Sequence, residues 1–277
     1  MDSKILLAKI DGWIENLASM TDAAAQTELF KAYLRTSAAF HEYSWGNQIL
    51  IWMQRPDATR VAEFNTWKTL NRNVKKGAKG ISILAPLLAK IKPDDPNYDP
   101  NDPKSSRLYG FRAVYVFDVS DTEGEPLPDL DVKYRADGDG SMIVAALESA
   151  AKEIGADIEY TDNLPEGTKG SSSSNHQIKI RKSMLSMEQA GTLAHELAHE
   201  LLHHRHFNPE RPPSKEQREL EAESVSYMVM QYFGVEQPSQ FYLAAWNATA
   251  TQIKDSLQTI RDTAKQIIDH ITMEVLV

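Results

Sequence analysis

The chain has 277 residues, 42% hydrophobic and 25% charged, which is the composition of a folded globular protein and excludes a disordered or fibrous one. It contains no cysteine, so disulfides, thiol nucleophiles and thiolate metal ligands are excluded. The net charge of -9 argues against a surface that coats nucleic acid everywhere, and no apolar run approaches the roughly 20 residues of a membrane span. We therefore expect a cytoplasmic protein of two domains that makes no membrane contact.

The first half of the chain predicts helices followed by strands. Apolar side chains recur at helical spacing up to the Arg55-Pro56 step, and β-branched or aromatic alternation appears after it. The expected elements are three helices within residues 1–55, a short helix over 61–70, and strands over 80–86 and 110–117. Turn residues without an apolar period at 120–131 predict the linker, which gives two domains, 1–131 and 132–277.

The second half predicts a mixture of helices and short strands, so the fold class is α+β. Ser186 and Gln189 fit a capping box that would begin a central helix. The Gly- and Ser-rich run from Gly167 to Asn175 has the composition of a loop. The expected elements are helices over 143–154, 186–204, 215–233 and 253–271, and strands over 157–160 and 176–181.

The sharpest chemical signal is the HExxH pattern His195-Glu196-Leu197-Ala198-His199 within the central helix. Two histidines four residues apart lie on one face of a helix and can bind one Zn²⁺ ion. Glu196 would stand beside the metal and polarise a water molecule. The pattern therefore predicts a catalytic zinc site with Glu196 as the acid/base group.

A catalytic zinc site needs a third protein ligand. A third histidine six residues after His199 is excluded, because Arg205 stands there. The run from Glu219 to Glu223 in the next predicted helix offers three glutamates. Small residues that allow close approach flank Glu221 and Glu223, and we take Glu221 as the third ligand with Glu223 as the alternative.

A zinc ion held by two histidines and a glutamate suits amide hydrolysis. The substrate could lie antiparallel along an exposed edge strand, for which residues 176–181 are the natural candidate. The sequence does not choose a further hydrogen-bond donor for the transition state. Four side chains are available: Tyr227, Tyr242, His203 and His204.

The N-terminal half contains a basic stretch interleaved with aromatic residues. Between Arg60 and Lys92 there are eight basic residues and one acidic residue, Glu63. Cations that follow a phosphate backbone and aromatic rings that stack on bases are the two components of single-strand binding. The candidate nucleic-acid-binding residues are Trp45, Arg60, Lys68, Arg72, Lys75, Lys76 and Lys79.

Several motifs in one order resemble the ArdC-type antirestriction family. They are YSWGNQILIWMQRPDATRV, FNTWKTLNRNVKKGAKGISILAP, VFDVSDTEGEPLP, HELAHELLHH and ELEAESVSYMV. The resemblance extends from about Phe40 to about Phe233. It implies an N-terminal single-stranded-DNA-binding domain, helical with a small β-hairpin or sheet, fused to a C-terminal zincin-like metallopeptidase domain related to ImmA and IrrE peptidases.

By this resemblance His195, His199 and Glu221 are the metal ligands and Glu196 is the catalytic residue. The protein would bind single-stranded DNA, cleave an unknown protein substrate and protect the incoming DNA of a plasmid or other mobile element. Two alternatives remain: a DNA-binding protein whose zinc site is not proteolytic, and a regulatory peptidase that cleaves a repressor.

Overall fold

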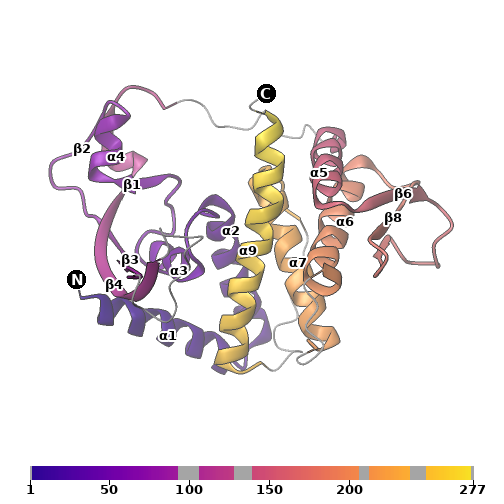
Figure 1. Cartoon of the computed structure of the whole chain (residues 1–277), viewed down its shortest axis with the longest axis horizontal. Coiled ribbons are helices and arrows are strands. Elements are labelled where there is room, and N and C mark those ends of the chain that lie inside the picture. The colour runs from indigo at the N-terminus through magenta and orange to yellow at the C-terminus, as the bar shows by residue number, and fades with distance from the viewer. Residues whose placement is uncertain (1, 93–105, 128–138, 206–211, 238–247, 276–277) are drawn as a thin grey trace. The chain divides into compact units, whose positions relative to one another are not determined.

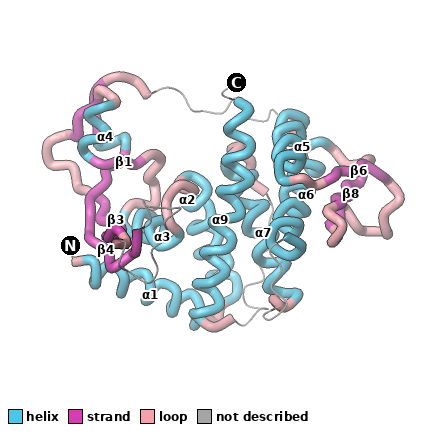
Figure 2. Tube along the Cα trace, viewed as in Figure 1, coloured by secondary structure: helices cyan, strands magenta, loops and turns pink. Residues whose placement is uncertain are grey.

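The computed structural model describes residues 2–92, 106–127, 139–205, 212–237 and 248–275. It has the α+β class expected from the sequence, with long helices and three small sheets (Figures 1 and 2). Among the described residues, no helix has the length and apolar character needed to span a membrane.

The chain divides into two compact units. The first unit comprises Met1–Trp13 and Ile49–Leu127, and the second comprises Ile14–Gln48 and Pro128–Val277. Residues 14–48 join the second unit because helix α2 (Ala23–Ala39) buries Phe30, Tyr33 and Leu34 and packs against α7 (Lys215–Tyr232). The division of the chain at residue 131 into two functional domains remains a prediction.

The first unit is built around an antiparallel sheet with strand order β1-β4-β3. A second, two-stranded sheet pairs β2 with β5. The elements are β1 (Val61–Glu63), α4 (Phe64–Thr69), β2 (Arg72–Val74), β3 (Ile81–Lys90), β4 (Ser106–Asp118), η1 (Val119–Asp121) and β5 (Thr122–Gly124), with parts of α1 (Ser3–Ser19) and α3 (Trp45–Gln54).

Two of the differences between the first unit and the sequence prediction have one physical cause. Residues 61–63 form strand β1 instead of helix because they pair with β4, and the helix begins only at Phe64. The predicted linker at 120–131 contains β5, whose Thr122 lies opposite Val74. In both cases a partner strand distant in sequence supplies the backbone hydrogen bonds.

Trp67 anchors α4 to the β1-β4-β3 sheet. Its side chain is 2% exposed, and its indole Nε1–H donates to the carbonyl oxygen of Phe117 at 2.9 Å. We expect Trp67→Ala to lower the free energy of unfolding by about 3–5 kcal/mol, because it leaves a large cavity and an unpaired carbonyl. Urea unfolding of the full chain measures this. Leu70→Ala, at a side chain 42% exposed, is the control, and equal losses in the two variants would contradict the role of Trp67.

The second unit is a helical bundle beside a small three-stranded sheet. Helix α7 contacts α2, α6 and α9, and α5 contacts both α6 and α9. In the sheet, β8 lies between β6, which is parallel to it, and β7, which is antiparallel. The remaining bounds are α5 (Ser141–Ile154), β6 (Asp157–Thr161), β7 (Gly170–Ser172), β8 (Gln177–Arg181), α6 (Ser186–His199), η2 (Glu200–Arg205) and α9 (Ala250–Val275).

The central helix departs from its prediction at both ends. Leu185 is the N-cap and no side chain caps the helix, because the Ser186 hydroxyl instead donates to Asp139 and accepts from the backbone N–H of Gly140. The capping-box prediction is therefore wrong. After His199 the α-helix gives way to the π-helical turn η2, a feature often found beside functional sites.

Candidate metal centre

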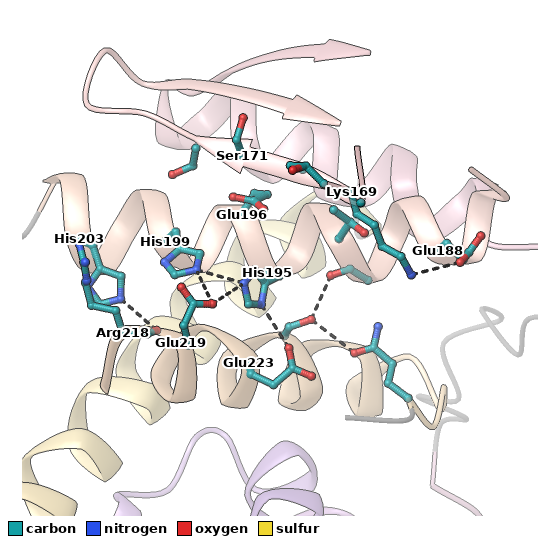
Figure 3. Close-up of a pocket in the computed structure, with 18 of the residues that line it drawn as sticks. Lys169, Ser171, Glu188, His195, Glu196, His199, His203, Arg218, Glu219 and Glu223 are labelled. Carbon is teal, nitrogen blue, oxygen red and sulfur yellow. Dashed lines mark hydrogen bonds and ion pairs between the residues drawn. The ribbon is translucent and has the colours of Figure 1, made fainter. Parts of the chain in front are cut away.

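Two helices of the second unit bring three metal-binding side chains together. His195 and His199 lie one turn apart on α6, with their Nε2 atoms 3.0 Å from each other. Glu219, in the second turn of α7, places its Oε2 atom 3.7 Å from the Nε2 atom of each histidine. These three side chains form one cluster of possible metal ligands. Figure 3 shows Glu219 between the two imidazole rings.

The spacing of these three atoms fits one tetrahedral ion. Ligands at about 2.0–2.2 Å from a tetrahedral Zn²⁺ lie roughly 3.4 Å from one another. The distances between the donor atoms of His195, His199 and Glu219, from 3.0 to 3.7 Å, bracket this value. The donor set is also the histidine–histidine–glutamate set of catalytic zinc sites.

Glu223 supports the cluster from the next turn of α7. Its Oε2 atom lies 3.2 Å from the Nδ1 atom of His195, the ring nitrogen that does not face Glu219. Burial lowers the pKa of His195, but Glu219 and Glu223 outweigh it and raise the pKa to about 9. A carboxylate on the second nitrogen fixes the orientation and tautomer of a metal-binding imidazole. Glu223 is therefore placed to orient His195.

The pKa values of the other two members of the cluster are both lowered. Burial lowers the pKa of His199. Hydrogen bonds from His195 and His199 hold the pKa of Glu219 well below its usual range, against the effect of burial. A neutral imidazole and an ionised carboxylate are the forms that bind a metal ion.

Glu196 points from α6 toward β7, on the side away from α7 (Figure 3). Its side chain is buried, and burial raises its pKa to about 7, although the charge of His195 and the backbone N–H of Ser172 act in the opposite direction. A Cβ atom at Gly170 would lie 2.9 Å from Cγ of Glu196 and 2.7 Å from Cγ2 of Thr192. Glycine at 170 thus lets β7 approach the helix closely enough to enclose Glu196.

The structure does not bring Glu221 to the histidines. Its carboxylate is buried, accepts from the Ser256 hydroxyl at 2.5 Å and from Nε2 of Gln217 at 2.9 Å, and so faces α9. Two residues along an α-helix correspond to about 200°, which turns Glu221 away from the face that carries Glu219 and Glu223. The structure therefore places Glu219, and not the preferred Glu221, beside the two histidines.

Sequence reasoning passed over Glu219 although a signal for it was present. Glu219 and Glu223 are four residues apart, so they share a helix face in the same way as His195 and His199. Small neighbours, which suggested Glu221, instead mark where α7 packs into the bundle: Ala222, Ser224 and Ser226 are all buried.

The cluster opens into a pocket of about 830 Å³ that lies wholly within the second unit. It is lined by β7 and its flanking residues, by α6, by the first turns of α7, and by residues 235–237. Of the candidate hydrogen-bond donors, His203 and His204 line this pocket. Tyr227 is buried and is absent from its lining, and Tyr242 lies outside the described residues.

His203 is held as a neutral donor. Burial, reinforced by the nearby charge of His199, lowers its pKa to about 4. The Nε2 atom of His203 lies 3.3 Å from the carbonyl oxygen of Arg218. A neutral ring that is protonated at Nε2 can donate a hydrogen bond to this oxygen. This contact ties the π-helical turn η2 to α7.

Of the two edge strands of the small sheet, β6 and β7, the one that lines the pocket is β7. Residues 176–181 contain β8, which lies in the middle of the sheet with a partner on each side, so they cannot accept a further strand. The prediction that they form the substrate-binding edge is wrong. Strand β7, in the segment predicted as a loop, pairs only with β8 among the described strands and borders the pocket.

The predicted nucleic-acid residues lie in different surroundings. Trp45 belongs to the second unit, where Nζ of Lys254 lies 5.7 Å from its ring centroid. Arg72 is engaged by Thr122 and by the carbonyl oxygen of Glu125 on the β5 side. Lys75 donates to the carbonyl oxygen of Ser120.

The other four candidates also lie in the first unit. Lys68, Lys76 and Lys79 are exposed, and Lys68 Nζ lies 4.8 Å from the ring centroid of Phe64. The Arg60 side chain is half-buried, and its backbone N–H donates to Asp118. Trp45 thus belongs to a different unit from the six cationic candidates.

Comparison with known proteins identifies both parts of the chain. Residues 9–117 match the N-terminal domain of anti-restriction factor ArdC, and residues 151–237 match the IrrE N-terminal-like domain of the peptidase family M78. No curated protein matches the chain.

Two crystal structures of the antirestriction ArdC protein from the R388 plasmid resemble the chain. Each is 18% identical and is matched over 82% of this chain and 84% of that one. The TM-score is 0.50 for the Mn(II)-bound structure, a likeness of fold, and 0.48 for the metal-free structure. The two domain matches together cover more than two thirds of the sequence. The chain thus belongs to the ArdC-type antirestriction family and joins an ArdC N-terminal domain to an IrrE-like domain with a metallopeptidase-like fold.

Proposed function

We propose that this protein is an antirestriction factor that binds single-stranded DNA through its N-terminal domain and hydrolyses a peptide bond in its C-terminal domain. It would act in the cytoplasm on incoming mobile-element DNA. The observation that carries the peptidase part is the cluster of His195, His199 and Glu219 with buried Glu196 beside it.

The residues that would hold a metal ion are His195, His199 and Glu219. The relative from the R388 plasmid has a Mn(II)-bound structure. The two imidazoles and one carboxylate of this chain are the donor set of catalytic zinc, and we propose Zn²⁺ as the ion. A bound Zn²⁺ ion supplies a Lewis acid that polarises a carbonyl group and lowers the pKa of a water molecule.

Glu196 is the proposed general base. Its enclosure by β7 and its raised pKa match a carboxylate that takes a proton from the attacking water and passes it to the leaving amine. Glu223 orients His195 through Nδ1 and is a positioning residue. The substrate would be an extended segment of protein that lies antiparallel to β7, the sheet edge at the pocket.

The DNA-binding part of the proposal is supported by the ArdC N-terminal domain match and by the exposed cations of the first unit. Lys76 and Lys79 lie in the turn between β2 and β3, and Lys68 lies on α4. Because such cations bind phosphate and release counterions, affinity should fall steeply with salt.

Fluorescence anisotropy of labelled oligonucleotides with the full chain tests DNA binding. We expect tighter binding to single-stranded than to duplex DNA, with log K falling linearly with log salt. The double substitution Lys76→Gln and Lys79→Gln should reduce the slope by about 0.7 for each phosphate that the variant no longer neutralises. Lys152→Gln, at an exposed lysine of α5, is the matched control. The absence of binding would contradict the proposal. So would a salt dependence of the double variant that equals that of the wild type and of Lys152→Gln.

A further inference from the structure

One face of the β1-β4-β3 sheet in the first unit carries a row of aromatic side chains. Alternate residues of a strand point to the same face, so Phe111, Ala113, Tyr115 and Phe117 of β4 share one side. Phe64, the first residue of α4, extends the row, with its ring centroid 6.4 Å from that of Phe117. Four rings from two neighbouring elements thus follow one line along the sheet.

Three of the four rings are exposed although they are large, and the fourth, Phe117, is half-buried. Tyr115 is 49% exposed, Phe64 45% and Phe111 37%. On the same sheet, Ile83 is 5% exposed and Val116 is 1% exposed. The hydrophobic core of the first unit therefore contains these side chains and leaves the exposed rings outside it. An exposed row of this kind marks a binding surface more often than a packing defect.

A glycine opposite the row lets the rings lie across the sheet. A Cβ atom at Gly80 would lie 2.9 Å from Cδ1 of Tyr115 and 3.3 Å from Cε1 of Phe117. Any larger residue at position 80 would require these rings to shift. Gly80, and Ala113 between Phe111 and Tyr115, have no large side chains that would cover the faces of the neighbouring rings.

The spacing of the rings suits unpaired bases. Tyr115 and Phe117 are two residues apart on an antiparallel strand, which separates them by about 6.8 Å, and Phe111 lies four residues from Tyr115, at about twice that separation. Stacked bases along one strand of B-DNA are only about 3.4 Å apart and turn their faces to one another. A duplex therefore has no free base faces for such a row, whereas an extended single strand does.

Positive charge lies near the end of the row that Phe117 and Phe64 form. Lys68 Nζ lies 4.8 Å from the Phe64 ring centroid, and exposed Lys79 immediately precedes Gly80. The sequence from Arg60 to Lys92, which contains α4 and β3, has eight basic residues and one acidic residue. Aromatic faces beside cations are the two features of sequence-tolerant single-strand binding.

We propose that Phe64, Phe111, Tyr115 and Phe117 form a platform on which unpaired DNA bases stack, with Lys68 and Lys79 beside the phosphates. The proposal rests on the proposed single-strand binding and deepens it, because it assigns the base contacts to four aromatic residues that are not among the seven candidates selected from the sequence.

Anisotropy with the full chain and a labelled single strand tests the platform. Tyr115→Ala and Phe111→Ala should each weaken binding by about 5- to 150-fold, the effect of removing one base–aromatic stack. Tyr115→Phe keeps the ring and should bind as the wild type does. Tyr115→Leu keeps apolar volume over Gly80 but lacks a π face, so it should bind weakly. Leu88→Ala, at a side chain 57% exposed on β3, is the control for the removal of apolar area.

An abasic oligonucleotide of the same length separates stacking from phosphate contact. The wild type should bind it more weakly than the normal strand, and Tyr115→Ala should then cause no further loss. If the wild type binds the normal strand but Tyr115→Ala and Phe111→Ala bind equally well, the platform is wrong and single-strand binding stands. If the wild type does not bind, both are wrong. Equal losses with normal and abasic strands would also overturn the platform.

Discussion

Glu219→Ala is expected to weaken the binding of Zn²⁺ to the full chain by more than about 100-fold. Substitution of residues that merely orient metal ligands costs about 10- to 100-fold in affinity, and a direct ligand should cost more. Oε2 of Glu219 lies 3.7 Å from both histidine Nε2 atoms, so its loss leaves two ligands. Titration of metal-free protein against a chromophoric zinc chelator measures the affinity, and repetition with Mn²⁺ compares the two ions.

Glu221→Gln is the matched control for this substitution, only two residues away on the same helix. Its carboxylate is bound to Ser256 and Gln217, so zinc affinity should change by less than about 3-fold. Thermal unfolding would show separately whether the buried contact with α9 matters for stability. Loss of zinc binding in Glu221→Gln, with retention in Glu219→Ala, would restore the ligand preferred from the sequence and contradict the structural assignment.

The second large effect concerns catalysis. Glu196→Gln should lower the rate of peptide-bond cleavage by about 10²- to 10⁴-fold, because an amide cannot take a proton from water. Zinc affinity should remain close to that of the wild type, since Glu196 points toward β7 and not into the ligand cluster. Incubation of the zinc-loaded chain with an unfolded protein and a peptide library, followed by mass spectrometry, measures the cleavage.

Glu153→Gln, at an exposed glutamate of α5, controls for the loss of one negative charge. It should cleave at the wild-type rate. Cleavage by Glu196→Gln at the same rate as Glu153→Gln would show that the activity does not come from this site. If the wild type and both variants all fail to cleave, the result would favour a metal site without proteolytic function.

Local spacing was enough to predict the helix that carries His195 and His199. A four-residue interval places two side chains on one helix face whatever the surroundings are, and the structure brings the two rings together. Choosing the third ligand required knowing which face of α7 turns toward α6. That depends on packing against α2 and α9, which no local pattern contains.

Strands that depend on distant partners were the hardest to predict. Strand β7 consists of Gly170, Ser171 and Ser172, a composition typical of loops, and it is a strand because β8 supplies its hydrogen bonds. Strand β1 is extended for the same reason, through its pairing with β4. Local sequence patterns therefore could not predict either strand, although β7 borders the pocket and β1 belongs to the sheet that carries the aromatic row.

The DNA surface shows a related limit. Composition indicated that cations and aromatic residues would form the DNA-binding surface. It could not distinguish Trp45, which contacts Lys254 of α9, from aromatic residues that are exposed on a sheet. The alternation of Phe111, Tyr115 and Phe117 was readable in the sequence. Which face of the strand is covered was not, because both faces of β4 carry apolar residues.

Protection of unmodified DNA in cells tests the central claim most directly. Three cell lines with an active restriction system would produce the wild-type chain, Glu196→Gln or Glu153→Gln. Each would receive the same unmodified plasmid, and the number of cells that maintain the plasmid would be counted. The account predicts protection by the wild type and Glu153→Gln, and loss of most protection in Glu196→Gln at equal protein level. Equal protection by all three would contradict it and show that DNA binding alone is sufficient.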